Sequence, residues 1–265
     1  MKNFIIVLLI SFNLTVLSLG LPKTNHDPYV AKIVQAAQLT IVDSHLLKRM
    51  DEVSVNIITD KGIGSGTILI EKVGDKVYRF ILTSGHVVDG ADPESIRIIQ
   101  NQEQDGVLYG KWHSTAKVVK VTKQGDYDIA ILAVVTETFK PTVKVTFSPN
   151  KYAKNGDRIC HVGSSLGYQN SFLFGHVSRI GRYLTVEEKS QLYDQIQVGA
   201  YKGSSGGGVF SEKGEFLGIY SRVLSENIGF MTPLRQIKEW AARDGFTWIF
   251  DETTPPKEVL DIFPQ

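Results

Sequence analysis

Short apolar segments, separated by turns rich in glycine, asparagine and aspartate, run through the chain from about residue 50 onward. Many short strands at such spacing, without alternating helices, are typical of antiparallel sandwiches and barrels. The sequence therefore predicts an all-β fold. The segments predicted as strands are VSVNIIT (53–59), GTILIE (66–71), VYRFILT (77–83), SIRIIQ (95–100), AKVVKVT (116–122), IAILAV (129–134), DRICHVG (157–163), FLFGHVSRI (172–180), GGVFS (207–211) and EFLGIYS (215–221).

The composition is that of an ordinary globular protein. The chain has 265 residues, of which 42% are hydrophobic and 22% charged, a length that fits one large all-β unit or two smaller domains. The formal net charge is +1 and no basic run stands out, so we expect no nucleic-acid partner.

The first twenty residues are expected to be a signal peptide. A lysine at position 2 is followed by a nearly continuous apolar run over residues 4–19, and Ser18 and Gly20 are small residues at a suitable cleavage position. The alternative is an uncleaved membrane anchor, for which the run is short and is interrupted by Asn13. Either way the protein is expected to be exported, to the periplasm or the medium.

The remaining segments outside the strands divide the chain further. Residues 21–49 are expected to be an N-terminal extension with a short helix through Tyr29–Gln38, and residues 246–265 a C-terminal tail. Before the tail, Thr232 is expected to cap a helix that has Pro233 in its first turn and Gly245 at its end. One face of this helix is apolar at helical spacing: Leu234, Ile237, Trp240 and Ala241.

The single cysteine, Cys160, excludes an intramolecular disulfide. An exported chain without bridges fits a bacterial-type envelope or secreted protein better than an animal one. Cys160 lies in an apolar stretch, and we expect it to be a buried packing residue.

Three segments together suggest chemistry that none of them suggests alone. His86 follows a strand in ILTSGHVV, Asp128 precedes an apolar strand in GDYDIAILAV, and Ser205 lies in KGSSGGGV. A serine hydroxyl becomes a nucleophile when an imidazole takes its proton, and a buried carboxylate holds that imidazole in one tautomer. A glycine-rich turn can aim backbone N–H groups at a developing oxyanion; the Gly203 and Ser205 amides would be these donors.

The order and form of these segments, T-S-G-H-V-V, D-I-A-I-L and G-S-S-G-G-G, resemble the chymotrypsin-fold serine proteases, and most closely the bacterial HtrA/Deg type. The resemblance covers about residues 50–245, the expected protease domain. It extends to GSGTILI (64–70), GDRICHVGSSLG (156–167), GHVSRIGR (175–182), the run from 196 to 221 and NIGFMTPLRQIKEW (227–240).

The resemblance implies a role for each matched residue. His86 would be the general base, Asp128 would orient it and Ser205 would attack the carbonyl. Asp126 competes for the orienting role and Ser204 for the nucleophile. We favour Asp128 because it directly precedes Ile-Ala-Ile-Leu, and Ser205 because it directly precedes the Gly-Gly pair.

The family also implies a fold and a way of binding substrate. It implies two six-stranded antiparallel β-barrels with a C-terminal helix, the first barrel carrying His86 and Asp128 and the second Ser205. Peptide substrate would lie as an added strand along the segment Tyr220, Ser221, Arg222 and Val223. Gly199, at the base of the specificity pocket, carries no carboxylate, so we expect cleavage after uncharged apolar residues.

Protein or peptide substrates are the expected partners, with membrane contact only through residues 4–19; the oligomeric state stays open. No cofactor and no metal are expected, because the histidines form no ligand cluster. A PDZ domain, frequent in such proteases, is not expected in the tail, and Gly208 stands where the family most often has proline.

Two other functions compete with that of an active serine endopeptidase. A catalytically silent relative could use the cleft to bind extended peptides, although all three triad positions are filled. An α/β-hydrolase esterase would need a histidine after the nucleophile, and none follows Ser205.

Overall fold

The computed structural model describes residues 43–264, apart from residues 105, 106, 137, 138, 140, 151, 187, 226 and 252. The expected signal segment and the helix at 29–38 therefore lie outside the described residues. Within the described part of the chain, no helix is long and apolar enough to cross a membrane.

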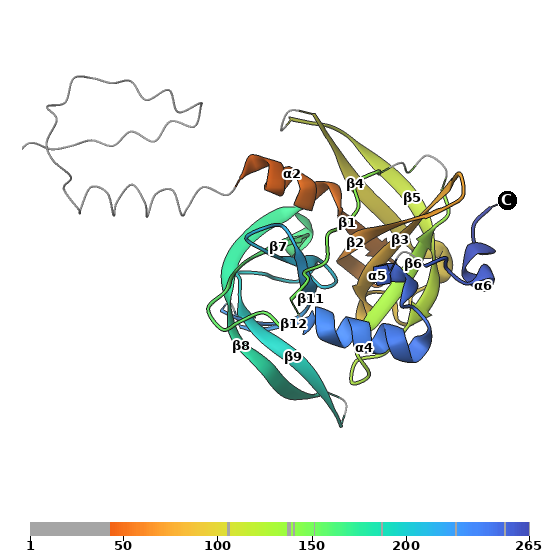
Figure 1. Ribbon diagram of the computed structural model, residues 1–265. Helices are drawn as coiled ribbons and strands as arrows, with labels where there is room; N and C mark the ends of the chain where they lie inside the picture. The colour runs from red at the N-terminus through yellow and green to blue at the C-terminus, as the bar shows by residue number, and fades with distance from the viewer. Residues whose placement is uncertain are drawn as a thin grey trace, which may run out of the picture. The chain divides into compact units, whose positions relative to one another are not determined.

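The first barrel contains six antiparallel strands in the closed order β1-β2-β3-β6-β5-β4 (Figure 1). Ile57, Ile68, Ile81, Ile98 and Leu132 fill its interior and are fully buried. Alternating side chains along each strand place these residues on the inner face. The strands are β1 (Ser54–Thr59), β2 (Gly62–Val73), β3 (Lys76–Ser84), β4 (Arg97–Gln104), β5 (Val107–Val121) and β6 (Ile129–Val134).

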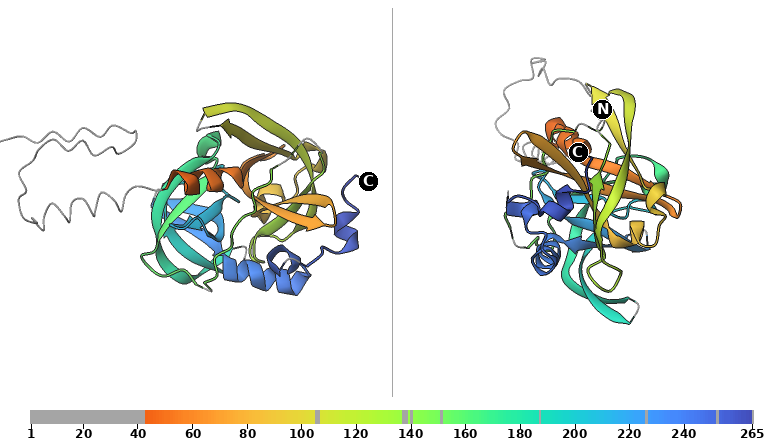
Figure 2. Two further views of the ribbon diagram at one scale, coloured as in Figure 1. Left: turned by 45° about the horizontal axis from the view of Figure 1, so that its top comes forward. Right: turned by 90° about the vertical axis from the view of Figure 1, so that its right-hand side faces the viewer.

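The second barrel has the same number of strands in the closed order β10-β11-β12-β9-β8-β7. Val177, Ile196, Val209 and Met231 fill its interior. Figures 1 and 2 show the long β8–β9 hairpin projecting beyond the barrel body. The strands are β7 (Arg158–Gly163), β8 (Ser171–Val186), β9 (Lys189–Gln197), β10 (Gly208–Ser211), β11 (Phe216–Ser225) and β12 (Ile228–Pro233).

A third apolar cluster joins the two barrels. It includes Phe80 of the first barrel, Phe210 and Phe216 of the second, and Trp240 and Trp248 from the C-terminal helices. Trp240 is fully buried, so α4 (Leu234–Asp244) packs by its apolar face along the junction of the barrels (Figure 1). The predicted two-barrel fold with a C-terminal helix is confirmed.

The start of α4 differs from the sequence-based expectation. Thr232 belongs to β12 and does not cap the helix; Pro233 occupies the N-cap position, with no side-chain cap hydrogen bond. The strand runs directly into the helix, which leaves Thr232 paired with Ile219 in the sheet. The other end agrees with the prediction, because Gly245 closes α4 in the left-handed conformation at φ 81°.

The remaining helices are short. An unpredicted helix, α2 (Ser44–Glu52), precedes the first barrel, with Asp43 accepting from the His45 backbone N–H at its start. The others are α3 (Gly85–Val88), α5 (Trp248–Asp251), α6 (Lys257–Leu260) and two 3₁₀ turns at Pro93–Ser95 and Ser165–Gly167.

Candidate active site

His86 and Asp128 meet at one end of the first barrel. His86 lies in α3, directly after β3, and its Nδ1 lies 2.9 Å from Asp128 Oδ2 and 3.1 Å from Oδ1. The His86 backbone N–H also donates to Asp128 Oδ1 at 2.9 Å. Because carboxylate oxygens accept hydrogen bonds, this contact suits the tautomer with its proton on Nδ1, in which Nε2 is an acceptor.

Asp128 is buried, with an exposed fraction of 0%. It lies in a loop in which Tyr127 and Asp128 both have left-handed backbones, at φ 66° and 54°. Ser221, from β11 of the second barrel, donates its hydroxyl to Asp128 Oδ2 at 2.7 Å. Asp126 points elsewhere and pairs with Arg243 at 2.7 Å, at the protein surface.

The Ser205 turn needs glycine on both sides. Gly203 and Gly206 have φ values of 97° and 89°. A Cβ on Gly203 would lie 2.2 Å from the Ser164 carbonyl oxygen, and one on Gly206 would lie 2.0 Å from Thr83 Oγ1. Only glycine combines such φ values with such close backbone approach.

Ser65, from β2 of the first barrel, fixes the carbonyl groups of this turn. Its hydroxyl donates to the Gly203 carbonyl at 2.7 Å, and its backbone N–H donates to the Ser205 carbonyl at 2.8 Å. Within the described part of the chain, the Gly203 and Ser205 amides make no hydrogen bond. The turn thus leaves two of its backbone N–H groups, those of Gly203 and Ser205, without an acceptor in that part of the chain.

The two neighbouring serines have different surroundings. Ser204 is fully buried and its hydroxyl lies 2.6 Å from that of Ser165. Ser205 is half-buried, and its hydroxyl donates to the Ser221 carbonyl at 3.2 Å. No hydrogen bond between Ser205 Oγ and His86 occurs among the described residues. Ser221 therefore links two of the predicted triad positions, through its hydroxyl to Asp128 and through its carbonyl to Ser205.

The segment expected to bind substrate is part of β11, which pairs with β12 on one side. Tyr220 is buried, and both its backbone groups are used: its N–H donates to Gly207 and its carbonyl accepts from Gly206. The Tyr220 backbone is thus not available for pairing with an added strand. Gly199 is exposed, and a Cβ there would meet nothing within 4 Å.

Two buried residues behind the Ser205 turn are kept uncharged. Burial lowers the pKa of His161 to about 4, and its Nδ1 donates to the Gly208 carbonyl at 3.1 Å. Cys160 is buried in the apolar cluster that joins the barrels, as expected, and this burial raises the pKa of its thiol to about 12. At Gly208, a Cβ would lie 2.6 Å from the Phe210 ring, so ring packing explains the glycine there.

Sequence reasoning missed the contribution of Ser65 and of the Ser221 hydroxyl. The GSGTILI segment was matched to the family, but nothing in it indicates that Ser65 contacts residues 138 positions later. Ser221 was predicted only as a substrate contact, because its bond to Asp128 spans the barrel interface.

Two closed six-stranded antiparallel barrels with this strand order define the chymotrypsin-like class of fold. Residues 64–219 match the trypsin-like peptidase domain family, and the chain belongs to that family.

Comparison with individual proteins points to one branch of the family. A probable periplasmic serine endoprotease, DegP-like, from Pseudomonas fulva is 33% identical over 171 residues, covering 64% of this chain and 31% of the relative. A probable periplasmic serine protease, do/HhoA-like, from Haemophilus influenzae is 28% identical over 170 residues, covering 64% of this chain and 32% of the relative. The chain thus spans about a third of the length of these curated relatives.

Solved structures agree on the fold. The Rv3671c protease from M. tuberculosis superposes with a TM-score of 0.59 at 19% identity, covering 78% of this chain and 93% of that one. The serine endoprotease from Yersinia pestis gives a TM-score of 0.57 at 24% identity, covering 76% of this chain and 66% of that one.

Proposed function

We propose that this chain is an exported serine endopeptidase that hydrolyses protein or peptide substrates through an acyl-enzyme on Ser205. The observation that carries the proposal is the contact of His86 Nδ1 with the buried Asp128 carboxylate at 2.9 Å. This contact orients the imidazole so that Nε2 can accept the Ser205 proton.

In the proposed reaction, Ser205 Oγ attacks the scissile carbonyl carbon while its proton passes to His86 Nε2. The C–N bond then breaks as the same proton is given to the leaving amine, which leaves an ester on Ser205. A water molecule, deprotonated by His86, hydrolyses the ester and restores the serine. The Ser205 hydroxyl, which donates to Ser221, would turn toward His86 in the reactive state, a tightening common in catalytic hydrogen bonds.

The Gly203 and Ser205 amides would bind the oxyanion formed at each attack. Both are without hydrogen bonds among the described residues, and both belong to a turn whose carbonyls are fixed by Ser65. Donors held in place in advance stabilise developing charge without reorganisation during the reaction.

The substrate would add a strand to β11 along Ser221, Arg222 and Val223, with its side chain before the cleaved bond directed toward Gly199. The open space at Gly199 and the missing carboxylate favour uncharged apolar residues there. A peptide library tests this preference; dominant cleavage after arginine or lysine would contradict it. Export is supported by the periplasmic descriptions of the relatives.

The function is tested by labelling with a fluorophosphonate probe, which reacts with activated serines. We expect wild type and Ser204→Ala to be labelled and Ser205→Ala to be unlabelled. Ser204→Ala is the matched control, because it removes the neighbouring hydroxyl and leaves the turn glycines in place.

Two results would contradict the proposal. Loss of labelling in Ser204→Ala, with retention in Ser205→Ala, would show that Ser204 and not Ser205 is the nucleophile. No labelling of any folded form, together with retention of an extended peptide in a fluorescence anisotropy assay, would favour a peptide-binding protein without catalysis.

A further inference from the structure

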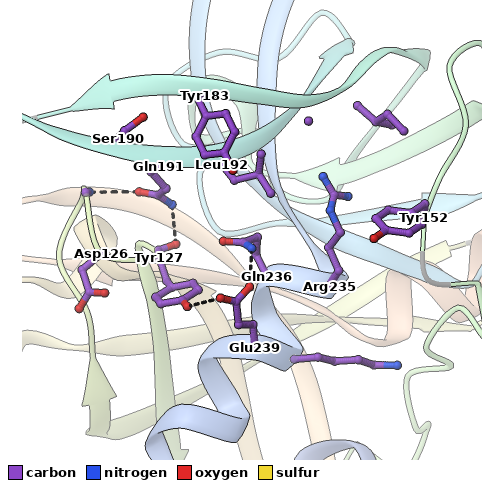
Figure 3. Close-up of a pocket in the computed structure, with 14 residues that line it drawn as sticks. Asp126, Tyr127, Tyr152, Tyr183, Ser190, Gln191, Leu192, Arg235, Gln236 and Glu239 are labelled. Atoms are coloured by element: carbon purple, nitrogen blue, oxygen red, sulfur yellow. Dashed lines mark hydrogen bonds between the residues drawn. The ribbon is translucent and has the colours of Figure 1, made fainter.

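An open groove of about 1000 Å³ lies behind the Asp128 loop, between the β8–β9 hairpin and α4. Its walls include Gly125, Asp126 and Tyr127 of the loop, Gln191 of β9 and Glu239 of α4 (Figure 3). His86 and Ser205 do not line it. The groove therefore exposes the back of the segment that carries the predicted triad aspartate.

Gln191 binds the backbone of this loop at two points. Its Oε1 accepts from the Gly125 N–H at 3.1 Å, and its Nε2 donates to the Tyr127 carbonyl at 2.8 Å (Figure 3). Gln191 is 4% exposed, so both ends of its amide are bound away from solvent. A buried amide that makes hydrogen bonds to two backbone groups two residues apart restrains the conformation of the loop between them.

The loop needs such a restraint. Tyr127 and Asp128 are consecutive non-glycine residues in the left-handed region, a conformation that persists only where the surrounding structure holds it. The Asp128 carboxylate receives three hydrogen bonds, from the His86 backbone, the His86 ring and Ser221. A change in the backbone at Tyr127 would move the carboxylate relative to these donors.

The contacts from α4 are of another kind. The Tyr127 hydroxyl donates to Glu239 Oε1 at 3.0 Å, and the Arg243 guanidinium lies 4.8 Å from the centre of the Tyr127 ring. These contacts hold side chains at the surface, where exposed charged pairs contribute little. Gln191 alone among these residues binds the loop backbone from a buried position.

We propose that Gln191 is a positioning residue that holds the loop 125–127, and through it the Asp128 carboxylate, in the geometry that orients His86. The expected effect of Gln191 on kcat rests on the proposed peptidase function. The expected effect of Gln191 on the His86–Asp128 hydrogen bond does not, because that bond can be observed without turnover.

The test is Gln191→Met, which keeps the length of the side chain and removes both hydrogen bonds. We expect kcat on a peptide substrate to fall about 10-fold to 100-fold with KM nearly unchanged, as for a small displacement of a catalytic group. The low-field proton NMR resonance of the His86 Nδ1–H should shift upfield or broaden, which a purely structural role distant from the triad would not cause.

Gln236→Met is the matched control, because Gln236 lines the same groove and its amide donates to the Glu239 side chain. We expect it to keep wild-type kcat and the wild-type resonance. The proposal is overturned if Gln191→Met leaves the resonance unchanged in the folded protein, or if Gln236→Met changes it equally. If wild type neither hydrolyses peptides nor labels, the peptidase function fails and the resonance alone decides the role of Gln191.

Discussion

The two loops that carry the candidate site are each held by the opposite barrel. The Asp128 loop belongs to the first barrel, yet Gln191 and Ser221 of the second bind it. The Ser205 turn belongs to the second barrel, yet Ser65 of the first fixes its carbonyls. The geometry of the site therefore depends on the barrel interface as much as on either barrel.

The two loops differ in how they are held. The Ser205 turn is bound by neutral, buried donors and packs on the buried His161 ring, whose Cε1 would lie 2.7 Å from a Cβ on Gly207. The Asp128 loop has the buried Gln191 and Ser221 contacts together with an exposed ion pair from Arg243 to Asp126. Salt screens exposed pairs and leaves buried hydrogen bonds nearly unaffected, so the two loops should respond to different perturbations.

The largest effect is expected from Asp128→Asn. An asparagine can fill the site, but it allows the wrong imidazole tautomer, and losses of about 10⁴-fold in kcat are expected from such a change in a triad. Steady-state kinetics on a peptide substrate measure it. Asp126→Asn is the matched control; it removes a surface ion pair worth about 0–1 kcal/mol and should leave kcat near wild type.

An inverted result would reassign the orienting role. If Asp126→Asn lost activity and Asp128→Asn kept it, the buried carboxylate beside His86 would be structural only. That outcome would also remove the basis for the expected effect of Gln191→Met on kcat, and the His86 resonance alone would then test the role of Gln191.

Acid should destabilise the protein through His161, beneath the Ser205 turn. Its folded pKa of about 4 lies below the ordinary value of 6.5, so the unfolded chain binds a proton that the folded chain does not. The free energy of unfolding should therefore fall as the pH drops from 6.5 toward 4, by up to about 3 kcal/mol. Urea unfolding across this pH range measures the loss.

The control for this prediction is His161→Asn, which can still donate to the Gly208 carbonyl but does not titrate. Its stability at neutral pH should be lower because it leaves a small cavity. Its pH dependence over this range should be shallower than that of wild type. An identical acid profile in both proteins would mean that other groups cause the loss.

Much of this fold can be predicted from the sequence, but only where a strand or a motif has a recognisable pattern within its own segment. The ten predicted strands all match observed ones, and β12 was matched through the family. Strand β9 was missed because its buried positions include Gln191 and Asp194, which give it no apolar pattern. Asp194 is buried because Arg235 from α4, 41 positions later, binds it at 2.6 Å.

The residues of the candidate site also fall into two groups, those that a sequence motif indicates and those that it does not. His86, Asp128 and Ser205 stand in short motifs that can be recognised from order and spacing. Ser65 and Gln191 act on backbone groups of distant segments, and a backbone group leaves no sequence signal. Their contribution follows from the closed barrels and the contact between them, which a single sequence does not encode locally.

The smallest effect is expected from Ser65→Ala, and it tests the cross-barrel restraint of the Ser205 turn. The change removes the donor to the Gly203 carbonyl and the acceptor for the Ser164 N–H. A lost buried hydrogen bond of this kind costs about 1–2 kcal/mol. If half of that cost is lost from the stabilisation of the oxyanion, kcat falls roughly 2-fold to 5-fold while KM stays nearly constant.

Thr67→Val provides the comparison, because Thr67 lies on the same strand and its buried hydroxyl has no partner among the described residues. Removing an unpartnered hydroxyl should leave kcat unchanged and stability equal or slightly higher. Equal losses of kcat in the two variants would show that β2 supports the turn by packing alone. A loss confined to Ser65→Ala would locate the restraint in the hydrogen bond between the barrels.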